Sequence, residues 1–159
     1  MTHQTDDLRI RTIKEVISPA AVRSEFPLPA AAAETVHQAR TAIQDILHGR
    51  DDRLLVVMGP CSIHDPDAAR EYAARLKTAG AALTADLIMV MRVYFEKPRT
   101  TVGWKGLIND PDLDGSFSIN KGLRIARRLM VDINALGVPT GTEYLDLITP
   151  QYFSDAVAW

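Results

Sequence analysis

Two short runs of consecutive apolar residues constrain the fold of this chain more than any other feature. They are Leu54–Met58 and Leu87–Met91, and neither run alternates with polar residues. Continuous apolar runs of this length fit strands that are buried on both faces, as parallel sheets require. A helical pattern lies between them, so residues 54–91 predict a βαβ unit, in which the two strands run parallel.

Amphipathic helices are predicted on both sides of these strands. Asp65 and Pro66 predict a helix start, because aspartate caps helix N-termini and proline suits the first turn. This helix continues along one apolar face to Gly80. Apolar residues spaced by three and four also predict helices over Ala30–Leu47 and Leu123–Leu136.

The remaining segments complete an alternating order. Val138–Glu143 predicts a third strand, and Thr149 with Pro150 predicts the start of a last helix. Before the first long helix we expect an extension with one short strand or helix around Leu8–Ile17, interrupted afterwards by prolines at 19, 27 and 29. A strand, a loop and a helix repeated three times is the order of doubly wound sheets and (β/α)₈ barrels.

The composition limits the classes of partner. The chain has 159 residues, of which 47% are apolar and 24% are charged, as in one globular domain. Its formal net charge of −2 gives no general attraction to nucleic acid or anionic membranes. No stretch has the length of a membrane span, and the single cysteine excludes an internal disulfide. We therefore expect a cytoplasmic protein that binds neither nucleic acid nor membranes.

A strongly basic segment follows the second predicted strand. It contains Arg92, Lys97, Arg99 and Lys105 against one carboxylate, Glu96. Open sheets and barrels place their ligands at the C-terminal ends of the strands, and these side chains suit phosphate and carboxylate groups. The segment predicts an anion-binding loop. A solvated surface run is the alternative, and three interleaved aromatic residues also allow nucleic-acid stacking, which the acidic chain disfavours.

Polar groups follow the other two predicted strands. Cys61 is equally consistent with a small buried side chain and with a metal ligand or nucleophile. His64 is more consistent with support of the adjacent helix start than with metal binding. Glu143 is a stronger functional candidate, because an unpaired carboxylate at a buried strand end is costly.

Three motifs resemble one family over nearly the whole chain. They are Gly59–Pro66, Met91–Pro111 and Thr149–Tyr152. Together they are similar to the N-terminal part of class I 3-deoxy-D-arabino-heptulosonate 7-phosphate (DAHP) synthases of the bacterial and yeast type. The central motif is long and highly specific.

The resemblance implies an α/β fold: about three βα units, the first part of a (β/α)₈ TIM barrel, preceded by an N-terminal extension and helix. It implies a transferase that condenses phosphoenolpyruvate with erythrose 4-phosphate, the first step of the shikimate pathway to aromatic amino acids. It also implies a divalent metal ion (Mn, Fe, Co or Zn) that polarises the aldehyde. Both substrates are anions, as the basic segment predicts.

The resemblance also assigns site residues by position. Arg92 and Lys97 correspond to catalytic residues that bind phosphoenolpyruvate, and Cys61 to a metal ligand. The other substrate-binding positions are Arg99 and Thr100, which hold the phosphate of erythrose 4-phosphate, and Glu143, beside the phosphoenolpyruvate pocket.

Regulation by an aromatic amino acid and assembly into a homo-oligomer are further implications. Residues 1–52 would form the extension and helix with oligomeric and regulatory contacts, and residues 53–159 the partial barrel. The matching effector positions are Asp146, Leu147, Pro150 and Gln151, with Asp6 and Asp7 of a neighbouring subunit.

The chain differs from such an enzyme in length. A (β/α)₈ barrel needs ~250 residues, whereas this sequence stops at Trp159. The family's other metal ligands, a histidine and two carboxylates, correspond to positions beyond that residue. We expect the 159-residue polypeptide alone to be unstable and inactive, with uncovered strand edges and apolar faces. The alternative is a non-catalytic anion-binding or oligomer-interaction fragment.

Overall fold

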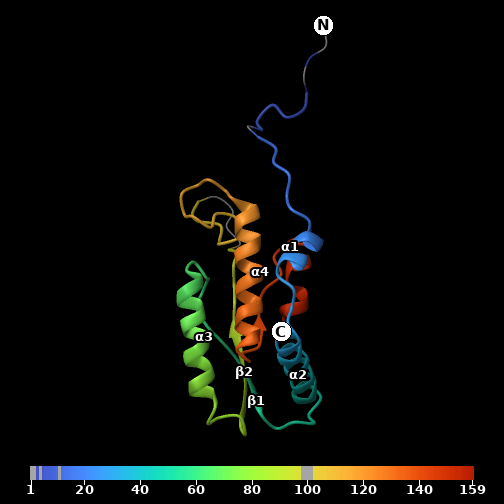
Figure 1. The fold of residues 1–159 in the computed structure, drawn as a ribbon, viewed down its shortest axis with the longest axis vertical. Coiled ribbons are helices and arrows are strands. Elements are labelled where there is room, and N and C mark those ends of the chain that lie inside the picture. Colours follow the sequence, from blue (N-terminus) through green and yellow to red (C-terminus); the bar gives the residue numbers. More distant parts are fainter. Residues whose placement is uncertain (1–2, 4, 11, 98–101) are drawn as a thin grey trace.

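The structure is a computed structural model, and it describes residues 3, 5–10, 12–97 and 102–159. The long helices stand side by side against one small sheet, and the N-terminal extension projects away from them (Figure 1). Within the described residues, no helix is both long enough and apolar enough to cross a membrane. The elements are α1 (Pro19–Glu25), α2 (Ala30–Leu47), β1 (Leu54–Met58), α3 (Pro66–Gly80), β2 (Leu87–Arg92), α4 (Ile119–Ala135), β3 (Thr140–Gly141) and the 3₁₀ helices η1 (Thr149–Tyr152) and η2 (Ser154–Ala156).

The sheet is parallel, with the strand order β1-β2-β3. Leu54 of β1 lies opposite Leu87 of β2, and the pairing continues to the ends of both strands. The predicted βαβ unit is therefore confirmed. Because both strands run the same way, the loops after β1 and β2 leave the sheet at the same edge.

Strand β3 is shorter than the predicted Val138–Glu143, because only Thr140 and Gly141, in the middle of that range, pair with β2. A Cβ on Gly141 would lie 3.0 Å from Val90 Cγ1, so glycine permits this close pairing. The next residue leaves the sheet. The backbone of this segment bonds instead to the end of the chain: the Thr142 amide donates to the carbonyl of Trp159 at 3.0 Å, and the Ala158 amide donates to the carbonyl of Thr140 at 2.8 Å.

One hydrophobic core joins α3, α4 and β2. Its fully buried members include Val93 and Met91 beside Leu129, Met130 and Ile133 of α4. Figure 1 shows α3 and α4 side by side along the sheet. Asp65 caps α3, since its side chain accepts the amides of residues 67 and 68, as the sequence predicts.

Strand β1 was expected to be buried on both faces, and this prediction is wrong for the described chain. Leu54 is 66% exposed, and Val57 and Met58 are also exposed. The strand has one neighbour, β2, so its outer edge and part of its surface lack cover among the described residues. This confirms the expected uncovered edge and apolar surface.

The prediction of one short strand or helix around Leu8–Ile17 is also wrong. The described residues of that range form neither element, and several of its apolar side chains are exposed. Helix α1 begins just beyond them, at Pro19, although the prolines were expected to interrupt regular structure. Proline suits the first helical turn, and the Ser18 hydroxyl accepts the Ala21 amide at 3.2 Å, so Ser18 and Pro19 start a helix.

The last predicted helix forms only as two short 3₁₀ turns, η1 and η2. Pro150 lies in the first turn of η1, as expected for a helix start. Phe153 then adopts a non-helical backbone conformation, with a φ of −145° and a ψ of 7°, which interrupts the helix after one turn. The ring of Phe153 packs edge-on against Phe95, with 5.9 Å between centroids, so burial of this aromatic side chain competes with helix continuation.

A buried arginine ties the N-terminal helices to the end of the chain. Arg127 of α4 is 1% exposed, and its Nε donates to the carbonyl of Phe26 at 2.9 Å. Its guanidinium also contacts both carboxylate oxygens of Asp155 in η2. Burial acts to raise the pKa of Asp155, but the hydrogen bond and charge of Arg127, with the charge of Arg23, hold that pKa below its usual range.

This pair predicts a specific stability effect. Asp155→Ala leaves the Arg127 guanidinium buried without its counter-ion, so we expect a loss of about 3 kcal/mol in the free energy of unfolding. Glu25→Ala removes the exposed partner of Arg124 and should cost about 1 kcal/mol or less. Chemical denaturation of the complete natural polypeptide measures both. Equal losses for the two variants would contradict the role given to Arg127.

Candidate functional site

Three predicted site residues come together where β1 and β2 end. The Nζ of Lys97 lies 2.8 Å from the Sγ of Cys61, and Arg92 Nη1 donates to the carbonyl of Pro60 at 3.0 Å. A Cβ on Gly59 would lie 2.6 Å from the Arg92 carbonyl oxygen. Glycine at 59 therefore lets the loop after β1 pass close to the end of β2, which brings the cationic groups onto the thiol.

Tyr94, just beyond the end of β2, helps to fix the direction of the Arg92 side chain. Its guanidinium carbon lies 3.7 Å from the centre of the Tyr94 ring, a cation–π contact. The Tyr94 carbonyl accepts the Ile63 amide at 2.7 Å, so the two strand-end loops are also joined through their backbones. Arg92 is half-buried, and its guanidinium group is oriented by the Pro60 carbonyl and the Tyr94 ring.

The two cations change the chemistry of Cys61. Its thiol is exposed, and the hydrogen bond from Lys97, followed by that from Arg92, lowers the pKa of the thiol below its usual value. The open interpretation of Cys61 as a small buried side chain is thus wrong. An exposed, cation-stabilised thiolate is suited to bind a metal ion or react with an electrophile.

Two described parts of the basic segment pair with each other, and we call this pairing, of Glu96 and Lys97 with Lys105 and Gly106, the 96–106 hairpin. Glu96 and Gly106 form an isolated antiparallel bridge at its base, and the Lys97 amide donates to the Lys105 carbonyl at 3.0 Å. Gly106 has φ +119°, and a Cβ there would meet the Phe95 carbonyl oxygen at 2.0 Å. Only glycine fits this base. The predicted site residues Arg99 and Thr100 lie outside the described residues.

Glu96 has no predicted role, yet the structure places it at the centre of a polar cluster. It is half-buried; its Oε1 accepts from Asn109 Nδ2 at 3.2 Å, and its Oε2 lies 3.3 Å from Thr149 Oγ1. Burial, followed by the charge of Asp146, raises the pKa of Glu96. The only signal in the sequence was its isolation as one carboxylate among four basic residues.

Glu143 does not meet the expectation of a buried carboxylate. It is exposed beyond β3, so the cost of burial that favoured a functional role does not apply. Glu143 does line a small cavity together with Tyr94 and Glu96. It therefore lies near the cluster at the strand ends, at the surface.

The predicted effector residues of this chain share one turn before and within η1. Asp146 organises that turn, because its Oδ1 accepts the amides of Ile148 and Thr149 at 2.5 and 2.8 Å. Leu147 is 90% exposed. Pro150 and Gln151 follow in η1, whereas Asp6 and Asp7 are exposed in the extension, and their contact with a neighbouring subunit stays a prediction.

Comparison with known proteins identifies the family. The family model described as DAHP synthetase I family matches residues 28–159. This chain belongs to that family. The DAHP synthetase I match covers α2 and every later element, so it includes the whole cluster at the strand ends.

Curated DAHP synthetase I relatives are similar over the whole chain. The Phe-sensitive phospho-2-dehydro-3-deoxyheptonate aldolase of Escherichia coli K12 is 62% identical over 159 residues, which are 100% of this chain and 45% of that protein. The Amycolatopsis methanolica aldolase is 59% identical over 97% of this chain and 76% of its own length. The Trp-sensitive aldolase of Enterobacter agglomerans is 54% identical over 99% of this chain and 45% of its own length.

A solved structure confirms the arrangement of the elements. The phospho-2-dehydro-3-deoxyheptonate aldolase of Francisella tularensis SCHU S4 matches with a TM-score of 0.92 and 53% identity. The match covers 94% of this chain and 44% of that protein. The chain thus spans somewhat less than half of the length of this protein and of the E. coli and Enterobacter relatives.

The described residues do not form a metal site by themselves. Cys61 supplies one thiolate, but no group of three or more histidine, cysteine, aspartate or glutamate residues is placed to hold an ion in the described part of the chain. His64 is exposed near the start of α3. A catalytic zinc-type site takes three protein ligands, so one thiolate is insufficient.

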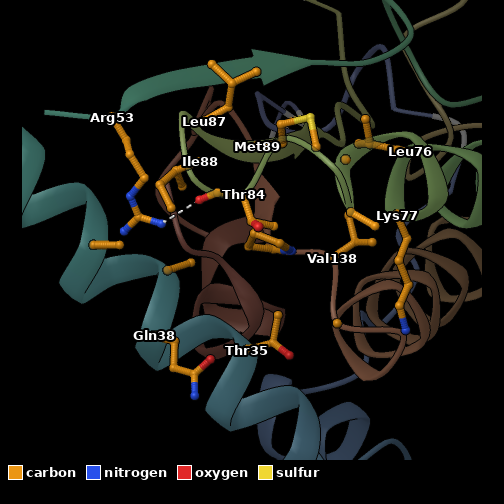
Figure 2. Close-up of a pocket in the computed structure, with 16 residues that line it drawn as sticks. Thr35, Gln38, Arg53, Leu76, Lys77, Thr84, Leu87, Ile88, Met89 and Val138 are labelled. Carbon is orange, nitrogen blue, oxygen red and sulfur yellow. Dashed lines mark hydrogen bonds between the residues drawn. The ribbon is translucent and has the colours of Figure 1, made fainter. Parts of the chain in front are cut away.

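The large cavity in Figure 2 lies at the opposite end of the strands from this site. It has a volume of about 620 Å³, and its walls come from α2, α3, the beginning of β2 and the residues just before β3. Arg53 at its rim is already paired with Asp51 and donates to the Thr84 carbonyl at 3.3 Å. The walls are mainly apolar, and the candidate site residues do not line this cavity.

The contact between Lys97 and Cys61 predicts the reactivity of the thiol. Because Lys97 lowers the pKa of Cys61, Lys97→Met should raise that pKa and slow alkylation by iodoacetamide at neutral pH. Lys105→Met is the control, since Lys105 belongs to the same hairpin and only its backbone is bonded to Lys97. Peptide mass spectrometry of the alkylated Cys61 peptide across a pH series gives the midpoint pH of alkylation. An unchanged midpoint in Lys97→Met would contradict this geometry.

Proposed function

We propose that the protein containing this chain is a DAHP synthase, which condenses phosphoenolpyruvate with erythrose 4-phosphate and releases phosphate. The observation that carries the proposal is the convergence of Lys97, Arg92 and Cys61 at the C-terminal ends of β1 and β2. Two cationic side chains at this edge suit a substrate with a phosphate and a carboxylate. Membership of the DAHP synthetase I family supports the same reaction.

Arg92 and Lys97 are the proposed ligands of phosphoenolpyruvate. Arg92 presents an oriented planar fork, whereas Lys97 presents a compact charge on a flexible stem. A bound ligand can replace the present partner of each side chain, which is the Pro60 carbonyl oxygen for Arg92 and the Cys61 thiol for Lys97. We assign Arg99 and Thr100 to the phosphate of erythrose 4-phosphate, and Glu143 to the rim of the phosphoenolpyruvate site.

In the proposed reaction, C3 of phosphoenolpyruvate attacks the aldehyde carbon of erythrose 4-phosphate. Positive charge develops at C2, water adds there, and phosphate leaves. Arg92 and Lys97 hold the anionic groups so that C3 faces the aldehyde, which converts the encounter of two anions into a reaction between positioned groups. Their charges also offset the repulsion between the two substrates.

We infer that the sheet is the start of a (β/α)₈ barrel. Residues 53–159 would supply its first βα units, and residues 1–52 an N-terminal extension and helix. Cys61 would be one ligand of a divalent metal ion (Mn, Fe, Co or Zn), whose other ligands lie outside the described residues. The ion would act as a Lewis acid on the aldehyde when bound.

The printed names of the relatives suggest regulation. One relative is Phe-sensitive and another Trp-sensitive. We propose that an aromatic amino acid binds at the turn of Asp146, Leu147, Pro150 and Gln151, with the extension residues Asp6 and Asp7 of a neighbouring copy in a homo-oligomer. The high exposure of Leu147 leaves apolar surface for such a contact.

Arg92→Ala tests the assignment in the complete natural polypeptide. It should lower kcat/KM for phosphoenolpyruvate by about 100-fold, because an oriented charge at the substrate is lost. Arg75→Ala is the control, since Arg75 is exposed on α3 and pairs only with Glu71 in the described structure. The assay measures formation of the seven-carbon product with added Mn²⁺.

Three outcomes of this assay decide the proposal. Equal activity in Arg92→Ala and Arg75→Ala would remove Arg92 from the site. No product from the unaltered polypeptide would overturn the function. The isolated 159-residue polypeptide, assayed in parallel, should show no turnover, because its described residues offer only one thiolate to the metal ion. Turnover by this polypeptide would contradict that expectation.

A further inference from the structure

Three oxygen atoms beside the 96–106 hairpin compete for one hydrogen atom. Thr149 Oγ1 lies 2.7 Å from Asp146 Oδ2 and 3.3 Å from Glu96 Oε2. A hydroxyl group has one hydrogen to donate, whereas an ionised carboxylate only accepts. If both carboxylates are ionised, one of the two contacts therefore brings oxygen lone pairs together and is repulsive.

Asp146 is the stronger acceptor of that hydrogen. Its contact with the hydroxyl is the shorter one, and it also accepts the amides of Ile148 and Thr149. Burial acts to raise the pKa of Asp146, but the hydrogen bonds of Thr149 and Ile148 hold it below its usual range. The Thr149 hydroxyl therefore donates to Asp146, and its lone pairs face Glu96.

A proton on Glu96 completes the arrangement. Glu96 Oε1 already accepts from Asn109 Nδ2, so a hydrogen on Oε2 would be donated to Thr149 Oγ1. Each group then donates to the next, from Asn109 through Glu96 and Thr149 to Asp146. The chain joins the base of the hairpin to the segment after β3.

The surroundings of Glu96 favour the neutral form. Among the described residues, the charge of Asp146 acts on it from the segment after β3, and Glu143 and Tyr94 line the same small cavity. Lys97 is its neighbour in the chain, but the Lys97 ammonium is directed to the Cys61 thiol. Burial and the Asp146 charge both oppose ionisation.

We propose that Glu96 is a positioning residue that secures the 96–106 hairpin in its protonated form, through Asn109 and Thr149, and releases it on ionisation. Its effect on catalysis rests on the proposed function of Lys97, but its effect on the hairpin does not. Because folding raises the pKa of Glu96, the link is complete below the ordinary pKa of a glutamate. The link is lost as the pH rises through the higher pKa of the folded state.

Amide hydrogen exchange of residues 96–110 in the complete natural polypeptide tests the link without any activity measurement. Glu96→Gln keeps the shape, and its amide donates to Thr149 at every pH. The ratio of the wild-type to the Glu96→Gln exchange rate should be near one at about pH 4 and should rise with pH, to about fivefold at about pH 8. Using a ratio removes the intrinsic pH dependence of exchange.

Two further comparisons separate the link from a general loss of charge. Glu34→Gln removes an exposed carboxylate on α2, bonded to Gln38, and should follow the wild type at every pH. Thr149→Val should open the hairpin at all pH values, whereas Thr149→Ser, which keeps the hydroxyl, should restore the wild-type profile. A pH-independent ratio for Glu96→Gln, or no effect of Thr149→Val, would overturn the proposal.

Kinetics then tests the catalytic consequence. KM for phosphoenolpyruvate should rise with pH in the wild type and stay flatter in Glu96→Gln, while kcat changes less, because the hairpin presents Lys97 to this substrate. Identical KM profiles alongside a pH-dependent exchange ratio would overturn only the catalytic part. An inactive wild type would overturn the proposed function, and the exchange data would still decide the link.

Discussion

The parallel pairing of β1 with β2 is the constraint on which the other features depend. It aligns Met58 with Met91, so the loops that follow open at one edge of the sheet. Gly59 then allows the first loop to approach the Arg92 carbonyl, where a Cβ would collide. The contact between Lys97 and Cys61 follows from this approach. A shift in register would separate the thiol from both cations.

Charge is arranged around this edge in two layers. The cations Arg92 and Lys97 lie against a thiol and a carbonyl, where an anion can replace those partners. Behind them, carboxylates hold the backbone: Asp146 organises a turn, and Glu96 joins that turn to the base of the hairpin. The first layer is suited to bind substrate, and the second to fix its geometry. This division explains why one half-buried acid lies within a basic segment.

The sequence predicted the parts of the fold that local patterns determine. The long apolar runs and the Asp65 cap identified both main strands and α3, because strand burial and capping act within a few residues. The exposure of β1 was missed, since it depends on cover from elsewhere in space. For the same reason the pattern gave Glu96 no role: its partner Thr149 is 53 residues away and becomes a neighbour only through the sheet.

The central claim is that the edge formed by Arg92, Lys97 and Cys61 receives phosphoenolpyruvate. A crystal structure of the complete natural polypeptide with this compound tests the claim most directly. We expect phosphoenolpyruvate oxygens within hydrogen-bond distance of the Arg92 guanidinium and the Lys97 ammonium, with the contacts to Pro60 and Cys61 replaced. Phosphoenolpyruvate bound elsewhere, with Arg92 still on the Pro60 carbonyl and Lys97 still on the thiol, would contradict the account.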